Sequence, residues 1–295
     1  MPGYAYNASA IGLGGVIKRG TLTTVVPTVA SVCLSPSGGD ASVSYDNYYR
    51  DDISFARAES RVSGSQVPMP PLSTVRRYVT YSEVYLRDLR IFDRIRIAVM
   101  QATMTSTREV QDRGPVRELD PDQTQFDIFV MYRGVEIDGG EVAPDVDASF
   151  CCRLNYGGFA GEVAASPRQG EILESSDAGI AVADFNSIAS NHKPFVGSVV
   201  KGLASRHFPS NNHKVNVGRF GDVRFGQILV KPDRQRFNLL RLELVSDWTG
   251  TRQDLPTVGG DADAADVNLL MSGGAGDGGS LSGGGGGSNG IPIWP

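Results

Sequence analysis

The densest group of acidic side chains in the sequence lies in the stretch GVEIDGGEVAPDVDASF, residues 134–150. Carboxylate oxygens on loops bent by glycine are the ligands that Ca²⁺ prefers in proteins. The acids do not follow the DxDxDG order of a calcium loop, so the same residues suit two polar turns equally well. The hypothesis of a calcium site rests on Asp138, Glu141, Asp145 and Asp147.

Two further acids, Asp51 and Asp93, occupy matching positions in two similar segments of the chain. A glycosidase needs two carboxylates that face each other across a groove, and this pair is the sequence's candidate for that chemistry. The alternative is that both are turn acids at equivalent corners of the fold. No GxSxG or phosphate-loop motif is present, so enzymatic activity is not the favoured interpretation.

Histidine and cysteine are too sparse and too scattered to predict a metal centre or a nucleophile. The histidines are His192, His207 and His213, without HxH or HExxH spacing, although the last two flank the turn-forming FPSNN and could meet in space. The cysteines are Cys33, Cys151 and Cys152. Three cysteines do not form a disulfide framework, and we expect small buried apolar residues and no cofactor.

Tyrosine gathers in the stretch SYDNYYRDD, which contains Tyr45, Tyr48 and Tyr49. Tyrosine-rich surfaces serve as platforms for sugars or as anchors for other proteins. The alternative is a strand with tyrosines at the surface of a sheet. The sequence therefore marks these residues as a possible ligand or partner surface.

The elements that would position these residues are predominantly β-strands. Short runs rich in Val, Ile, Phe, Tyr and Thr alternate with Gly, Asp, Asn and Pro, which is typical of strands and turns. Residues 221–248 predict a hairpin, because Leu240 and Leu242 alternate with Arg241 and the segment KPDRQ supplies turn chemistry. The pattern predicts an all-β fold with at most one or two short helices. The best helix candidate is residues 186–208, where apolar side chains recur at helical spacing.

Two segments, 44–65 and 86–107, match at an offset that places Ile53 on Ile95 and Ala56 on Ala98. Each reads as a strand, a break that contains aspartate, and a second strand. Units that cannot bury their apolar face alone must stack on a neighbour. The possible repeat therefore predicts strand–turn–strand units arranged as a β-sandwich or an irregular β-solenoid.

The chain divides by charge and composition near residue 252. The formal net charge of −5 comes entirely from residues 253–295, which carry five aspartates and no Lys or Arg, whereas residues 1–252 hold 28 acids and 28 bases. We therefore expect a single β-rich domain over 1–252, followed by an acidic, glycine-rich tail over 253–295. The tail ends in Ile-Pro-Ile-Trp-Pro, whose Ile291, Ile293 and Trp294 are suited to act as an apolar anchor on a glycine tether.

Several classes of function are not favoured by composition. The neutral body lacks the basic surface that attracts a phosphate backbone, so we do not expect nucleic-acid binding. No apolar run approaches the length of a membrane span. The N-terminus does not resemble a secretory signal, so the default location is the cytoplasm, with a non-classical export route or a processed precursor as alternatives.

Three functions follow from these observations, in order of preference. The first is a structural protein that self-associates into an oligomer or filament, with the tail docking on its own body or on a neighbouring subunit. The second is a carbohydrate-binding module that uses the tyrosines. The third is an enzyme acting on a polysaccharide.

Overall fold

The structure is a computed structural model that describes most of the chain. The described residues are 6–19, 22–50, 52–70, 73–111, 124–152, 154–165, 195–208, 210–211, 213–218, 221–230, 235–244, 265–267 and 272–276. They form two large sheets whose neighbouring strands run antiparallel. The prediction of an all-β fold is confirmed for these residues.

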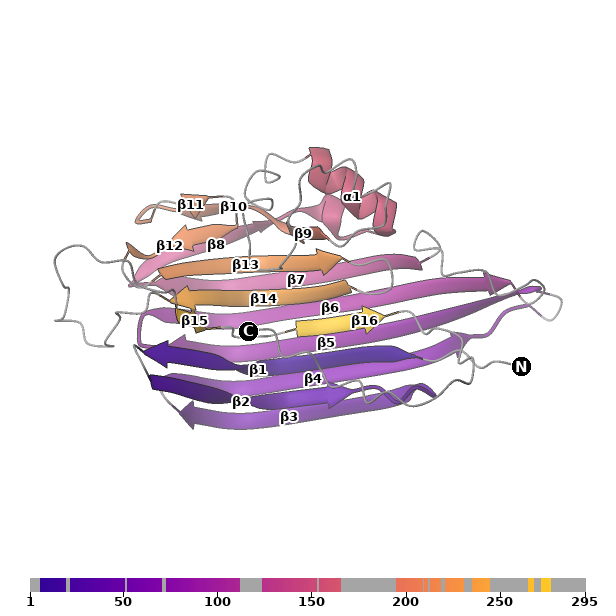
Figure 1. Cartoon of the computed structure of the whole chain (residues 1–295), viewed down its shortest axis with the longest axis horizontal. Helices are drawn as coiled ribbons and strands as arrows, with labels where there is room; N and C mark the ends of the chain where they lie inside the picture. The colour runs from indigo at the N-terminus through magenta and orange to yellow at the C-terminus, as the bar shows by residue number, and fades with distance from the viewer. Residues whose placement is uncertain are drawn as a thin grey trace.

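The first sheet has seven strands in the order β10-β8-β7-β6-β5-β4-β3. Six of its strands follow one another in the sheet as they do in the sequence, so each pairs with the strand that comes next in the chain (Figure 1). Its strands are β3 (Gly39–Arg50), β4 (Ile53–Val67), β5 (Val75–Ile91), β6 (Ile95–Gln111), β7 (Thr124–Ile137), β8 (Gly140–Val146) and β10 (Val200–Ser205).

The second sheet has nine strands, with a main order of β11-β12-β13-β14-β16-β1-β2. It joins the two ends of the sequence, because β16 lies between β14 and β1. Its strands are β1 (Asn7–Arg19), β2 (Leu22–Cys33), β9 (Phe195–Ser198), β11 (Ser210–Asn211), β12 (Lys214–Asn216), β13 (Gly221–Val230), β14 (Gln235–Leu244), β15 (Ala265–Val267) and β16 (Ser272–Gly276).

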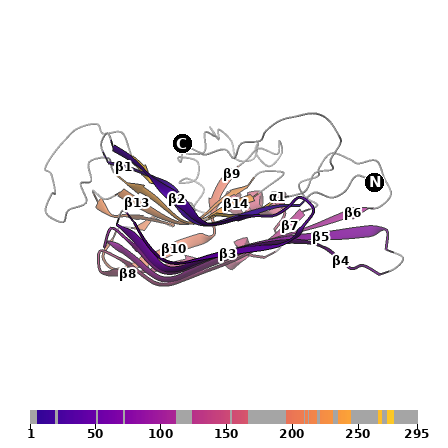
Figure 2. The same cartoon turned by 90° about the horizontal axis from the view of Figure 1, so that it is seen from below.

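The two sheets lie face to face and bury the apolar core between them (Figure 2). Strand β1 packs against β4 and β5 of the other sheet, and β14 packs against β6. A short α-helix, α1 (Tyr156–Ala165), and a 3-10 turn (Ala148–Phe150) add Phe159 and Phe150 to this core. Asn155 caps α1, because its Oδ1 accepts the Gly158 N–H at 2.8 Å.

The long strands of the seven-stranded sheet bend together along one line (Figure 2). The register places five residues opposite one another on this line, in the order Asn47, Ala56, Asp88, Ala98 and Gly134. Asn47, Asp88 and Gly134 have φ of 55°, 55° and 59°. These residue types tolerate the left-handed conformation, and alanine on the strands between them leaves room for the bend.

The nine-stranded sheet also has a left-handed residue on its strand β2. Ala30 of β2 has φ of 49° and faces Gly12 of β1. A Cβ on Gly12 would lie 2.9 Å from the Ala30 Cβ and 3.2 Å from the Ala58 Cβ of the other sheet. Small residues at this place therefore let the two sheets approach closely.

The phenol of Tyr132 joins the two sheets near the bend. Its hydroxyl donates to the carbonyl oxygen of Leu239 at 2.7 Å, across the core. Its ring meets Phe225 edge-on, with centroids 5.5 Å apart. Burial raises the pKa of Tyr132, and the Gly226 backbone opposes this shift in part.

Two local predictions can be compared directly with these elements. The hairpin predicted over 221–248 is confirmed, since β13 pairs with β14 and both Leu240 and Leu242 are buried. The helix candidate over 186–208 is wrong for its described part, because residues 195–205 form β9 and β10. Pairing of β9 with β13 overrides a spacing of apolar residues that suits a helix as well as a strand.

The possible repeat stays a prediction, although both of its segments contain hairpins. Residues 44–65 lie in β3 and β4, and residues 86–107 lie in β5 and β6. The turns of successive hairpins are joined by backbone hydrogen bonds, from Phe92 N–H to Asp52 O at 2.8 Å and from Asp138 N–H to Arg94 O at 2.7 Å. The boundary expected at residue 252 does not mark the end of the sheets, because β15 and β16 follow it.

Candidate functional site

One accessible feature of the fold is the free side of β3, which we call the β3 edge (Gly39–Arg50). Strand β3 pairs with β4 from Gly39↔Gly64 to Arg50↔Ile53, and no other strand among the described residues pairs with it. The edge of the other sheet, β2, lies at the same margin of the molecule (Figure 1). A strand at the margin of a sheet presents unpaired backbone N–H and C=O groups to another chain.

The three tyrosines singled out in the sequence all lie on this strand. Tyr48 is buried and stacks on Phe55 with ring centroids 5.0 Å apart, and Tyr45 meets both rings edge-on. Tyr45 is 45% exposed and Tyr49 is 80% exposed. Asn47, in its left-handed conformation, interrupts the alternation of the strand, so Tyr45 and Tyr48 share the core-facing side and Tyr49 projects from the opposite face.

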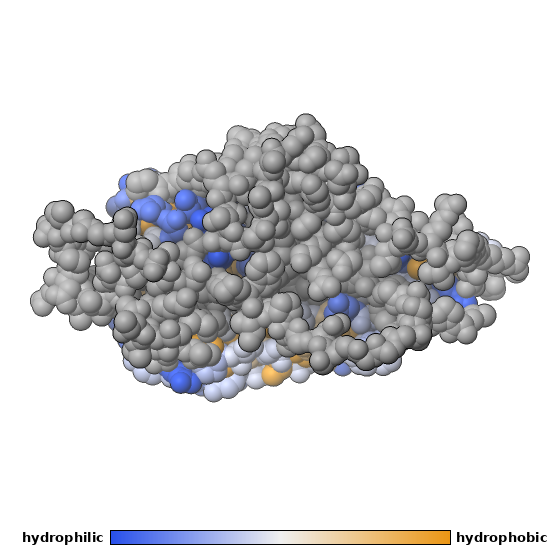
Figure 3. Space-filling model, viewed as in Figure 1, coloured by the Kyte–Doolittle hydropathy of each residue, from blue (hydrophilic) through white to orange (hydrophobic). Residues whose placement is uncertain are grey.

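Large exposed apolar or aromatic side chains are rare elsewhere on the described surface. Among the described residues, the only such side chain besides Tyr45 and Tyr49 is Phe129, on β7. The margin that carries β2 and β3 shows apolar and weakly polar surface beside a strongly hydrophilic group (Figure 3). The combination of open backbone and exposed aromatic rings marks the β3 edge as a contact surface.

A shallow polar groove of about 540 Å³ runs beside the edge. Its charged residues are largely engaged with one another, because Arg61 lies 3.3 Å from Asp40, and Arg57 contacts both Glu59 and Asp46. Exposed ion pairs of this kind contribute at most about 1 kcal/mol each. The groove is lined by Asp40, Ala41, Ser42, Val43, Ser44, Arg57, Glu59, Ser60, Arg61 and Glu83.

Glu83 forms the wall of the groove that is farthest from the edge. It accepts hydrogen bonds from the Tyr81 hydroxyl at 2.9 Å and from the Gln101 amide at 2.7 Å. Burial, and then the hydrogen bond to Glu83, raise the pKa of Tyr81 to about 12. The charged groups of the groove are therefore largely paired on the outside of a sheet, which suits binding better than acid–base catalysis.

The four acids proposed for calcium are spread along one hairpin. Asp138, in the β7–β8 turn, forms a two-point ion pair with Arg94, and Asp145 lies 3.4 Å from Lys201. Asp147 caps the 3-10 turn through Ser149, and Glu141 stands opposite Glu136 on the neighbouring strand. No group of three or more potential metal ligands occurs among the residues that the structure describes. The calcium site stays a prediction that this geometry does not favour.

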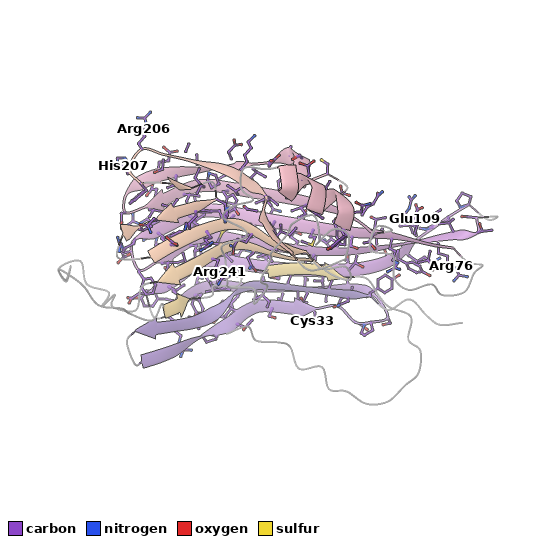
Figure 4. The ribbon with its side chains drawn as sticks, turned by 45° about the horizontal axis from the view of Figure 1, so that its top comes forward. Cys33, Arg76, Glu109, Arg206, His207 and Arg241 are labelled. Atoms are coloured by element: carbon purple, nitrogen blue, oxygen red, sulfur yellow. The ribbon has the colours of Figure 1, made fainter. Side chains whose placement is uncertain are left out.

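The histidines and cysteines do not converge on a site either. His207 is exposed beside Gly140 at one end of the molecule (Figure 4), whereas His213 is buried and its carbonyl oxygen accepts the Phe225 N–H of β13. Cys33 and Cys152 are exposed, contrary to the expectation of buried cysteines. Burial raises the pKa of Cys151 to about 11, so this thiol is a weak nucleophile near neutral pH.

Several residues singled out in the sequence lie outside the described part of the chain. They are the tail anchor Ile291, Ile293 and Trp294, together with Asp51 and His192. Asp93, the partner of Asp51 in the glycosidase hypothesis, lies in the turn between β5 and β6 with φ of 52°. A position in a turn agrees with the simpler interpretation of this aspartate.

Sequence reasoning did not identify the position of β3 at the margin of a sheet or the groove beside it. A signal was present, because Asp40, Ser42, Ser44 and Asp46 make one side of the strand polar, and its other side is only partly buried. A strand that is polar on one face and only partly buried on the other is typical of a sheet margin. Similarly, the alternation of Arg57, Glu59 and Arg61 on β4 indicated a charged outer face.

The fold and the β3 edge define an antiparallel all-β protein of two facing sheets with an open, tyrosine-bearing margin. Residues 4–160 match the profile of a family described as Domain of unknown function (DUF8256), and the chain belongs to this family. The matched part contains β1–β8 and the start of α1. No curated protein and no solved structure matches the chain. No helix of the described residues is long and apolar enough to cross a membrane.

Proposed function

We propose that this protein is a structural protein that assembles with copies of itself, and that the β3 edge forms the contact between them. The observation that carries the proposal is the open side of a twelve-residue strand that also bears Tyr45 and Tyr49. Backbone hydrogen bonds to a second strand would satisfy its free N–H and C=O groups. The aromatic rings would add the buried area that anchors a protein contact.

The other margins of the sheets suit this role less well. Strand β2 contains Pro27, which has no N–H to donate to a neighbouring strand. At the far margins, β10 and β11 have six and two residues. Strand β3 has twelve residues and no proline, so two β3 strands paired along their length would share roughly 40 Å of ladder at about 3.4 Å per residue.

Two finer features belong to the same proposal. Facing sheets built from consecutive hairpins support a β-sandwich better than a solenoid, because the long strands turn back on their neighbours and do not wind into coils. The C-terminal Ile291, Ile293 and Trp294 would add a second contact, on the same subunit or on a neighbour, as their apolar character indicates.

Lysine at the margin should prevent this association. In the variant Ser42→Lys/Ser44→Lys, two exposed residues of β3 become cationic beside Arg57 and Arg61, and like charges would meet where two copies pair. We expect association at least tenfold weaker than that of the unmodified chain, measured by analytical ultracentrifugation over a range of protein concentrations.

A matched control carries two lysines on the same outer face of the sheet, but on an interior strand. Thr103→Lys/Thr105→Lys places two lysines on the outer face of β6, away from the margin, and should associate like the unmodified chain. The proposal is wrong if the unmodified chain is a monomer at every concentration. It is also wrong if the β3 variant assembles as strongly as the control.

Carbohydrate binding is the second candidate, favoured by the exposed Tyr49 ring on the side of the sheet that carries the polar groove. Tyrosine faces and paired charges are the groups that bind sugars in shallow sites. Binding to a glycan array that disappears in Tyr49→Ala, by a chain that remains monomeric, would favour this function over assembly.

A further inference from the structure

Strand β16 holds the nine-stranded sheet together from the end of the sequence. It pairs with β1 from Asn7↔Gly276 to Ile11↔Ser272, and with β14 through Phe237↔Gly273 and Asn238↔Ser272. Among the described strands no other element joins β1 to β14. The place between these two strands is therefore a slot that an extended segment has to fill.

The sequence of β16 is Ser-Gly-Gly-Ala-Gly, which has almost no side chain to bury. Glycine weakens a strand, because it loses more conformational freedom on folding than any other residue. The segment is therefore held in the slot mainly by backbone hydrogen bonds to its two neighbours. The same segment of a second chain would form the same bonds.

The surroundings of the slot include buried polar groups whose hydrogen bonds are incomplete. Strand β16 lies against β5, whose core-facing side carries Thr80 and Ser82, each 1% exposed. Their hydroxyls, and the Oδ1 of Asn238 opposite Ser272, have no hydrogen-bond partner among the described atoms. An apolar strand would fit such surroundings poorly, because buried polar groups need partners, whereas a glycine-rich strand leaves room for water.

Strand β15 extends the same segment along β14. It pairs from Leu242↔Val267 to Leu244↔Ala265, so β15 and β16 follow β14 in one direction. Residues 245–264 therefore connect two residues that stand opposite each other, Leu244 and Ala265. A hairpin needs two to five residues for that connection. A chain of this length, if extended, would span roughly 65 Å, which is far enough to reach another subunit.

The slot also lies close to the margin where a neighbouring copy is proposed to bind. The order β16-β1-β2 places it two strands from the β2 margin, roughly 10 Å at the usual strand spacing. We propose that residues 265–276 exchange between copies, so that β15 and β16 of one chain fill the slot between β1 and β14 of another. This inference rests on the proposed assembly and names the segment that links its subunits.

Disulfide trapping tests the exchange in the full chain. Cys33, Cys151 and Cys152 are first replaced by serine. One tagged chain then carries Ser9→Cys, and a second, untagged chain carries Gly274→Cys; these two positions are partners in the register of β1 and β16. The chains are co-expressed and mildly oxidised. We expect a disulfide-linked pair of one tagged and one untagged chain. In the control, the untagged chain carries Gly202→Cys in place of Gly274→Cys, at a position with open surroundings. The linked pair should be at least tenfold more abundant with Gly274→Cys than with this control.

A single chain that carries both Ser9→Cys and Gly274→Cys completes the test. Exchange predicts that it forms covalent dimers and larger species. Three results together would overturn the exchange: ultracentrifugation shows an oligomer, this chain gives only an internally bridged monomer, and the mixed chains give no linked pair. These results would leave the assembly through the β3 edge intact. A chain that sediments as a monomer overturns both proposals.

Discussion

Gly134→Ala should lower the free energy of unfolding by about 3 kcal/mol. Gly134 has φ of 59°, which costs an L-residue roughly 1–2 kcal/mol. A Cβ at this position would also lie 2.8 Å from the Ala98 Cβ, and overpacking of this kind costs about 1–3 kcal/mol. The measurement is urea unfolding followed by circular dichroism.

Two other glycines separate these contributions. Gly139 has φ of 75° with no atom near its missing Cβ, and Gly202 has open surroundings and no positive φ. We expect a loss of about 1 kcal/mol for Gly139→Ala and almost none for Gly202→Ala. In the Gly134→Ala background, Ala98→Gly should recover part of the loss. Equal effects of Gly134→Ala and Gly139→Ala would show that close packing at the bend does not contribute.

Tyr132→Ala should lower the free energy of unfolding by about 4 kcal/mol, because it removes a core ring and the hydrogen bond that joins the two sheets. Tyr132→Phe keeps the ring and should cost about 1.5 kcal/mol, since the Leu239 carbonyl loses its donor. Thermal or urea unfolding of the three chains at neutral pH measures both differences.

The pH dependence of Tyr132→Phe tests burial of the phenol separately. The folded chain keeps this phenol protonated because its pKa is raised, whereas the unfolded chain ionises it above about pH 10. The unfolded state then binds fewer protons, so the unmodified chain loses stability as the pH rises further, by up to about 1.4 kcal/mol per pH unit. Tyr132→Phe lacks this loss, and the stability difference between the two chains should shrink above pH 10. A constant difference would contradict burial of the hydroxyl.

The sequence contained the local elements of this fold but not the arrangement of its sheets. The hairpin of β13 and β14 was predictable because its alternation and its turn residues lie within one short segment. The helix α1 was missed because Gly157 and Gly158 weaken its first turn. The sequence pattern of residues 195–205 predicts a helix because the pairing that makes them strands, such as that of Gly197 with Ile228, involves a distant segment.

The bend of the seven-stranded sheet leaves a pattern in the sequence that is recognisable once the register is known. Buried positions alternate along each strand and then jump by three across the bend. The jumps are from Phe55 to Ala58, from Leu86 to Leu89 and from Ile97 to Met100. The first and third jumps coincide in the proposed repeat, so the resemblance between 44–65 and 86–107 agrees with a shared bend.

The candidate site was predictable only in part. The tyrosines of β3 were recognised as a possible contact surface, but the margin that exposes them depends on the order of strands from distant parts of the chain. The carboxylates of residues 134–150 are close in sequence, but strand β8 is extended and holds their side chains apart. As a result, Asp138 and Asp145 have different cationic partners.

Hydrogen exchange along β3 is the most direct test of assembly through its edge. Backbone amides of Gly39–Arg50 that face away from β4 should exchange rapidly in a dilute solution and become protected as the protein concentration rises. Amides of β6, which has a paired strand on each side, should show no such change. An oligomer whose β3 amides exchange at the same rate at every concentration would contradict the central claim.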